Sequence, residues 1–305
     1  MTSSDPPPPG PCAPVIDVVA LRAELRSPTT AGAIDALDGA CRDTGFFVVT
    51  NHGLDGPLAE TFGAARDFFA LPDEDKAAVA LIGLDGFIPI GAARSGPKEM
   101  YDIGRRGGTV GDGRWPDLPG FATTIERYQD AALALATDLL QGLAVALDLD
   151  AGFFAERMTD PQCFLRLLHA PARPDATDST TGAHTDYGAI TLLATDGVAG
   201  LEVLPRGQDW QPVVAPPGAL VVNLGDMLAR WTNDRYASTP HRVTPGADER
   251  FSIPFFVNPD PGTVVTCLPS CVDTDHPCGY APITATDFLQ GRIDGTIPTG
   301  NGRHG

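Results

Sequence analysis

The sequence lacks any cluster of lysine and arginine residues. It has 21 basic and 39 acidic side chains among 305 residues, which gives a formal net charge of −18. Nucleic acids and anionic membrane surfaces repel such a protein, because both are negatively charged. We therefore expect neither nucleic acid nor a membrane among its partners, and we interpret the acidity as a solubility feature.

Long apolar runs are also absent. No stretch of about 18 apolar residues occurs, so we expect no membrane-spanning helix. The first residues, MTSSDPPPPGPCAP, contain no basic region followed by an apolar core, and we expect no signal peptide there. The proline tract instead predicts a disordered leader over residues 1–13.

The cysteines show no metal-binding pattern. None forms a Cys-x-x-Cys pair, and no histidine pair at zinc-finger spacing accompanies them. We expect free thiols in a reducing cytoplasm, with a disulfide inside residues 267–278 as the alternative. The six residues are Cys12, Cys41, Cys163, Cys267, Cys271 and Cys278.

What the chain does contain is enough apolar sequence for a sizeable core, at 43% hydrophobic residues. Before Pro161, apolar residues recur at helical spacing over 31–43, 58–71 and 125–149. Strand-like sequence occupies 45–53, and a short β-rich run occupies 14–21. Residues 82–120 hold many glycines and predict loops with short strands.

After Pro161 the pattern changes to short strand-like runs separated by Pro, Gly, Asp and Asn turns. Such regular spacing is typical of a sandwich or jelly roll. We therefore predict a mixed α+β fold with a jelly-roll core at 161–292, packed against an N-terminal helical region at 14–160, with a frayed tail at 293–305. The expected strands are 163–171, 189–196, 201–206, 219–226, 241–245 and 250–259.

The stretch GAHTDYGAIT at 182–191 places His184 and Asp186 two positions apart. On a strand, residues i and i+2 point to the same side with Cα atoms about 6–7 Å apart, so both side chains can bind one metal ion. A third ligand must come from another strand, and His241 is the best candidate. Two imidazoles and one carboxylate form the facial triad of non-haem Fe(II) oxygenases. Taken alone, His-x-Asp also fits a surface turn.

The segment after His241 suggests an anion-binding group. A turn near 245–248 would form a hairpin that pairs His241 with Ser252 and Val243 with Arg250, so that His241, Arg250 and Ser252 face one interior. A guanidinium in an apolar interior requires an anionic partner, and its planar fork suits a carboxylate. The alternative is that Arg250 lies at the surface or pairs with a neighbouring acidic residue.

These motifs resemble those of one known family. HTD at 184–186, HRV at 241–243 and RFS at 250–252 are similar to the isopenicillin N synthase-like family of Fe(II)/2-oxoglutarate-dependent dioxygenases. The likeness extends over nearly the whole chain, through PVIDVVAL (14–21), GFFVVTNHG (45–53), FFALPDEDK (68–76), VVNLGDMLARWTND (221–234) and CLPSCVDTDHPCGYAPIT (267–284).

The resemblance implies a double-stranded β-helix core, with Fe(II) bound by His184, Asp186 and His241. It implies that Arg250 and Ser252 hold the C5 carboxylate of 2-oxoglutarate and that O₂ is the second cosubstrate. The implied reaction is hydroxylation, desaturation or cyclisation of a small-molecule substrate, with release of succinate and CO₂. This chain departs from the family in one place, because a tyrosine often precedes the proline of the strand at 163–171 and here that residue is Ala170.

Further pocket residues are expected from strand alternation. Arg166 and Leu168 share a face of their strand with Ala170, so Arg166 could meet an anionic substrate, or it could form an ordinary salt bridge. His169 is a further candidate for the pocket lining. At Ala170, either the pocket is larger than in the family, or a water or His169 replaces the contact of the missing tyrosine.

Other candidates depend on position alone. Tyr101 and Phe256 could line the mouth or wall of the pocket, although both also fit simple packing. Asp226 and Asn233 are expected to be turn and scaffold residues that orient the metal-binding strands from behind the ligands.

Two alternatives remain open at this stage. One is a 2-oxoglutarate-independent oxidase of the same family, and the other is a non-catalytic small-molecule-binding protein with the same fold. The presence of all three candidate ligands favours an enzyme. The sequence predicts a cytoplasmic location and predicts neither the oligomeric state nor the identity of the substrate.

Overall fold

The computed structural model describes residues 13–26, 32–92, 96–175, 180–244 and 246–298. Most of the predicted leader (1–12) and the end of the predicted tail (299–305) lie outside these residues. Ala13, assigned above to the leader, is buried against the core. The domain boundaries suggested by the sequence stay a prediction.

A nine-stranded sheet forms the larger of two sheets that enclose the site. Seven of its strand pairings are antiparallel, and β1 pairs with β2 in parallel. Along the sheet the strands are β1 (Val15–Asp17), β2 (Phe46–Thr50), β11 (Leu220–Leu224), β8 (Ile190–Thr195), β13 (Arg250–Val257), β6 (Cys163–Ala170), β4 (Glu99–Arg106) and β3 (Gly86–Ile88), with β5 (Thr109–Val110) paired to β4.

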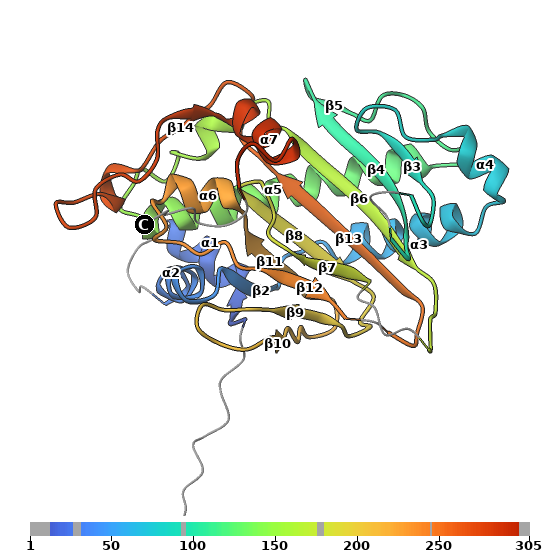
Figure 1. Cartoon of the computed structure of the whole chain (residues 1–305), viewed down its shortest axis with the longest axis horizontal. Coiled ribbons are helices and arrows are strands. Elements are labelled where there is room, and N and C mark those ends of the chain that lie inside the picture. The colour runs from blue at the N-terminus through green and yellow to red at the C-terminus, as the bar shows by residue number, and fades with distance from the viewer. Residues whose placement is uncertain (1–12, 27–31, 93–95, 176–179, 245, 299–305) are drawn as a thin grey trace, which may run out of the picture.

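The smaller sheet has the order β10 (Gln211–Pro212), β9 (Leu201–Val203), β12 (His241–Val243) and β7 (Thr181–His184). From β6 to β9, and again from β11 to β13, successive strands alternate between the two sheets (Figure 1). This alternation is the winding of a double-stranded β-helix, so the predicted jelly-roll core is confirmed.

Helices cover the face of the large sheet that points away from the small sheet. Figure 1 shows α3 (Asp55–Phe69) and α5 (Phe121–Ala146) behind the sheet, and both contact β13. In α5, Leu135, Leu139 and Leu143 recur at helical spacing and are fully buried. No described helix is both long enough and apolar enough to cross a bilayer.

The remaining elements are short or peripheral. Near the N-terminus, α1 (Val18–Arg26) and α2 (Ala33–Asp43) pack on α5. The others are α4 (Asp73–Ala78), η1 (Ala155–Arg157), α6 (Asp226–Trp231), β14 (Val264–Val265), η2 (Pro269–Cys271), β15 (Ile283–Thr284) and α7 (Ala285–Ile293).

The structure changes three expectations from the sequence. The run at 14–21 divides into β1 and the first turn of α1, and the glycine-rich segment at 82–120 contains the eight-residue strand β4. The predicted hairpin of His241 with Ser252 is wrong. Because β12 belongs to the small sheet and β13 to the large one, His241 pairs with His184 and Val203, whereas Ser252 pairs with Leu168 and Thr195.

A disulfide joins Cys267 to Cys278, with Cα atoms 5.7 Å apart. The expectation of free thiols is therefore wrong for these two residues, and the alternative within 267–278 is confirmed. Cys41, Cys163 and Cys271 are free. Spacing alone could not choose the partner of Cys267, because the path of the intervening loop decides which thiol approaches it.

We expect the double variant Cys267→Ala/Cys278→Ala to lose about 2–3 kcal/mol of unfolding free energy, since the bond restricts a short loop in the unfolded chain. The separation of the two cysteines is 11 residues. Denaturant titration of oxidised protein measures the loss, with Cys271→Ala as the control. Alkylation of Cys267 and Cys278 without prior reduction would contradict the assignment.

Candidate metal centre and substrate pocket

Three side chains that could bind a metal ion meet between the two sheets. His184 ends β7 and His241 begins β12, and the two residues are directly paired across the small sheet. Asp186 Oδ1 lies 3.8 Å from His184 Nε2 and 3.7 Å from His241 Nε2. One ligand atom from each residue lies within 4.8 Å of the others, so a single ion can contact all three.

Asp186 does not lie on the strand with His184, as the sequence pattern suggested. Strand β7 ends at His184, and the chain then turns, so Asp186 reaches the site from a loop. Its carboxylate is fixed by two side chains that the sequence analysis did not identify. Asn223 Nδ2 and Thr191 Oγ1 donate to Asp186 Oδ2 over 2.8 and 2.6 Å. These two donors leave Oδ1 directed at the imidazoles.

Both imidazoles are oriented by backbone carbonyls. His184 Nδ1 donates to Gly182 O over 2.9 Å, and His241 Nδ1 donates to Thr239 O over 3.2 Å. A ring that donates through Nδ1 keeps the Nε2 lone pair available for a metal.

The charges of the site also suit a metal ion. Burial and the neighbouring His241 lower the pKa of His184, so this ring stays neutral near pH 7. Burial acts to raise the pKa of Asp186, but the two imidazoles and its two hydrogen bonds lower it overall. The arrangement thus presents two imidazole nitrogens and one carboxylate.

The loop that carries Asp186 is held by the start of α6. Asp226 N donates to Asp186 O over 2.8 Å, and Asp226 Oδ2 accepts from Thr185 Oγ1 over 3.0 Å. Arg292 of α7 forms a buried ion pair with Asp226 at 2.7 Å. Asp226 therefore lies behind the metal ligands, as the sequence led us to expect.

Asn233 occupies a turn, as expected, with a φ of 51°, but its side chain does not lie behind the metal ligands. Its Nδ2 donates to Cys271 O over 3.1 Å, and its Oδ1 accepts from Gly279 N over 3.0 Å. Because α6 separates it from the metal ligands, Asn233 orders the disulfide loop.

A pocket of about 250 Å³ opens beside the three ligands. Its walls come from both sheets, with Leu168, Ser252 and Phe256 on the large sheet and Leu201 on the small one. Leu168 and Phe256 were both expected there.

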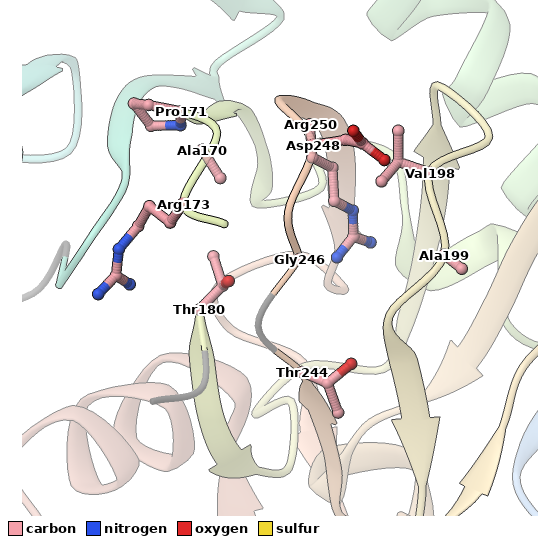
Figure 2. Close-up of a pocket in the computed structure, with 10 residues that line it drawn as sticks. All are labelled: Ala170, Pro171, Arg173, Thr180, Val198, Ala199, Thr244, Gly246, Asp248 and Arg250. Atoms are coloured by element: carbon pink, nitrogen blue, oxygen red, sulfur yellow. The ribbon is translucent and has the colours of Figure 1, made fainter. Parts of the chain in front are cut away.

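Arg250 and Ser252 line the same pocket although no hairpin joins them to His241. Arg250 is buried, and among the described residues no carboxylate lies within salt-bridge distance of its guanidinium. Its Nε has no hydrogen-bond partner. Burial lowers the pKa of the guanidinium, and the negative charge of Asp196 offsets part of this lowering. Figure 2 shows the Arg250 side chain directed into a side opening near Thr180 and Thr244. A buried cation in this state suits a carboxylate ligand.

Arg166 also lines the pocket, but it already has an anionic partner. Its Nε and Nη2 donate to the two carboxylate oxygens of Asp102 over 2.6 and 2.8 Å. This bidentate pair is the salt bridge that the sequence analysis left open as an alternative. The guanidinium still borders the pocket beside Leu168.

The structure contradicts the expectation that His169 lines the pocket. Leu168 and Ala170 face the pocket, so the intervening His169 points to the opposite side of β6. There His169 Nδ1 lies 2.7 Å from Glu99 and Nε2 lies 2.8 Å from Glu249. His169 therefore cannot replace the contact that Ala170 lacks.

Tyr101 is likewise outside the pocket, and the alternative of simple packing is confirmed for it. Met100 faces the pocket, and alternation along β4 turns Tyr101 toward the helices. Its ring packs 4.6 Å from that of Phe68, and its hydroxyl donates to Arg114 O over 3.1 Å. Tyr101 is a core residue.

Gly225 packs closely against the loop that carries Asp186, so a substitution there tests whether this contact positions the Asp186 carboxylate. A Cβ at this position would overlap the carbonyl oxygen of Gly188 and lie 3.0 Å from that of Asp186. We expect Gly225→Ala to cost about 1–3 kcal/mol of unfolding free energy and to weaken Fe(II) binding, since backbone must shift. Thermal unfolding and Fe(II) titration measure both effects.

Gly63→Ala serves as the control, because no atom lies within 4 Å of a Cβ at that position of α3. It is expected to raise stability by about 0.5–1 kcal/mol and to leave Fe(II) binding unchanged. Equal Fe(II) affinity in both variants would show that Gly225 does not position Asp186.

Comparison with known proteins gives consistent results. Residues 161–259 match the 2OG-Fe(II) oxygenase superfamily, and residues 13–115 match the family described as non-haem dioxygenase in morphine synthesis N-terminal. A 2-oxoglutarate-Fe(II) type oxidoreductase of Emericella nidulans is 38% identical over 288 residues, which cover 83% of this chain and 81% of that protein.

Solved structures agree over almost the entire length. A full-length protein of Neurospora crassa, solved in complex with alpha-KG and thymine, is 28% identical with a TM-score of 0.84, covering 93% of this chain and 97% of that one. The rice dioxygenase for auxin oxidation is 27% identical with a TM-score of 0.79, covering 95% and 97%. The chain therefore belongs to the 2OG-Fe(II) oxygenase superfamily, as an oxidoreductase that uses Fe(II), 2-oxoglutarate and O₂ to oxidise a small molecule.

Proposed function

We propose that His184, Asp186 and His241 bind the catalytic Fe(II) and that Arg250 and Ser252 bind the C5 carboxylate of 2-oxoglutarate. The main support for this proposal is the environment of the Arg250 guanidinium. No described carboxylate lies within salt-bridge distance of its buried guanidinium, which lines the pocket beside the three candidate ligands. A dicarboxylate that reaches from the metal to Arg250 would satisfy both ends.

Bound together, Fe(II), 2-oxoglutarate and O₂ supply the oxidant that attacks a substrate C–H bond, with succinate and CO₂ as co-products. The protein's own residues orient the reactants. Asn223 and Thr191 hold Asp186, so one carboxylate oxygen remains for the ion. Arg250 and Ser252 would bind the C5 carboxylate of 2-oxoglutarate, so that this end of the cosubstrate lies away from the metal. Whether the product is hydroxylated, desaturated or cyclised depends on the substrate.

Ala170 shapes the cosubstrate region in this proposal. It lies opposite Arg250 across the β6–β13 ladder and lines both the main pocket and the side opening of Figure 2. A side chain as small as alanine leaves room at this point. The cosubstrate carboxylate would then be bound by Arg250 and Ser252 without a tyrosine hydroxyl.

We propose that neither nucleic acid nor anionic membranes are partners of this protein, because its net charge is −18. We propose a cytoplasmic enzyme, although the disulfide of Cys267 and Cys278 is more common in oxidising compartments. Relatives that bind thymine or are named for auxin oxidation support an organic metabolite as the substrate.

Cosubstrate dependence tests the assignment of the activity. Anaerobic addition of 2-oxoglutarate to the Fe(II) protein is expected to produce a visible charge-transfer band, and O₂ should then be consumed with formation of succinate. Oxygen uptake that ignores 2-oxoglutarate would instead indicate the 2-oxoglutarate-independent oxidase. Absence of both the band and uptake would indicate a binding protein.

A single substitution tests the role of Arg250. We expect Arg250→Leu to raise the KM for 2-oxoglutarate by about 30-fold or more, because loss of one partner of a buried charge pair costs about 2–5 kcal/mol. Fe(II) affinity should remain within about twofold. Arg127→Leu, which breaks an exposed ion pair with Glu60, is the control. An unchanged KM in Arg250→Leu would refute the proposed carboxylate site.

A further inference from the structure

Lys98 is one of only two lysines in the chain, and its environment differs sharply from that of the other. Lys76 is buried, with its Nζ 2.9 Å from Glu99 and 3.1 Å from Asp73. Lys98 lines the substrate pocket, and its Nζ donates to Thr180 O over 2.9 Å. In the described part of the chain, no carboxylate lies within salt-bridge distance of it. An ammonium has three N–H donors, so two remain for a ligand.

The position of Lys98 separates it from the proposed cosubstrate group. Lys98 directly precedes β4, which borders β6, whereas Arg250 lies on β13 along the other side of β6. Ala170 therefore lies between the two cations. Thr180, which accepts the bond from Lys98, directly precedes β7, the strand of His184. The Lys98 side chain thus reaches from the start of β4 in the large sheet to the residue that precedes β7 in the small sheet.

The charges in the pocket balance except at Lys98. With neutral imidazoles, Fe(II) and Asp186 sum to one positive charge, and Arg250 adds a second. The two carboxylates of 2-oxoglutarate would cancel these, and Asp102 already cancels Arg166. Among the described residues that line the pocket, Lys98 then remains as the one positive charge without a negative partner. Burial and nearby Arg166 lower the pKa of Lys98 to about 8, which reflects the cost of this charge without an anion.

We infer that Lys98 binds a carboxylate of the primary substrate, with the fixed guanidinium of Arg166 beside it, so that the enzyme selects a small carboxylic acid. This inference rests on the proposed function, because the charge count assumes bound Fe(II) and 2-oxoglutarate. Lys98 also interacts electrostatically with His184. Because Thr180, which accepts from Lys98, directly precedes β7, a substrate anchored at Lys98 would lie beside the strand that carries His184.

Binding of matched acids and amides tests the inference. We would measure Kd anaerobically on Fe(II) protein saturated with 2-oxoglutarate, using benzoate, phenylacetate and cinnamate and their carboxamides as probes. At least one acid should bind 10-fold or more tightly than its amide. Lys98→Met should abolish this preference, and Lys98→Arg should restore part of it. Arg127→Met, which removes an exposed positive charge on α5, should behave as the wild type.

Chemical labelling supplies a second readout that does not depend on turnover. Cyanate should modify Lys98 in the wild-type protein, and peptide mass spectrometry should show that the tightly bound acid slows this reaction while its amide does not. Lys76 serves as the internal reference, since its ammonium is held by two carboxylates. Equal protection by acid and amide would overturn the inference.

The outcomes separate this inference from the proposed function. Failure of the wild-type protein to bind 2-oxoglutarate would refute the proposed function itself. Normal binding of 2-oxoglutarate without any acid preference, or a preference that survives in Lys98→Met, would refute only the role of Lys98. A rise in the Kd for 2-oxoglutarate in Lys98→Met equal to that in Arg250→Leu would make Lys98 a cosubstrate ligand and would also refute the inference.

Discussion

The site depends on how the loop at 185–188 is fixed against the start of α6. The Asp186 carboxylate accepts hydrogen bonds from Asn223 and Thr191, and its backbone carbonyl accepts one from Asp226 N. A buried carboxylate that is bound at one oxygen and free at the other has a defined direction for a ligand. The close approach of Gly225 to Gly188 makes this possible, because no side chain separates the two backbone segments.

The double-stranded β-helix then brings distant residues to one cavity. His184 and His241 are neighbours in the small sheet, whereas Arg250, Ser252 and Arg166 approach from the large sheet across the pocket. The two sheets therefore supply different functions. In the proposed site, the small sheet and its following loop would provide the metal ligands, and the large sheet would provide cations for carboxylates. Helices α3 and α5 pack against the other face of the large sheet.

Much of the fold could be predicted because it depends on local patterns. The helical periodicity of α5 and the alternating runs of β6, β8 and β13 are visible in the sequence, and they match the structure. Strand β4 was missed because it lies among glycines and turns. Strand alternation predicted that Arg166, Leu168 and Ala170 share a face, and all three line the pocket. The same alternation turns His169 to the opposite face, against Glu99.

The sequence by itself determined the chemistry that this protein can support: two histidines and an aspartate with metal-ligand character, and an arginine and serine suited to a carboxylate. These follow from residue type and from motifs that resemble a family. Only the tertiary structure decided the partners. It joined Cys267 to Cys278, assigned Asp102 to Arg166, placed Asn223 rather than Asn233 behind the metal ligands, and left Lys98 without a carboxylate among the described residues. Pairing of this kind depends on contacts between segments far apart in the chain, which no local sequence pattern encodes.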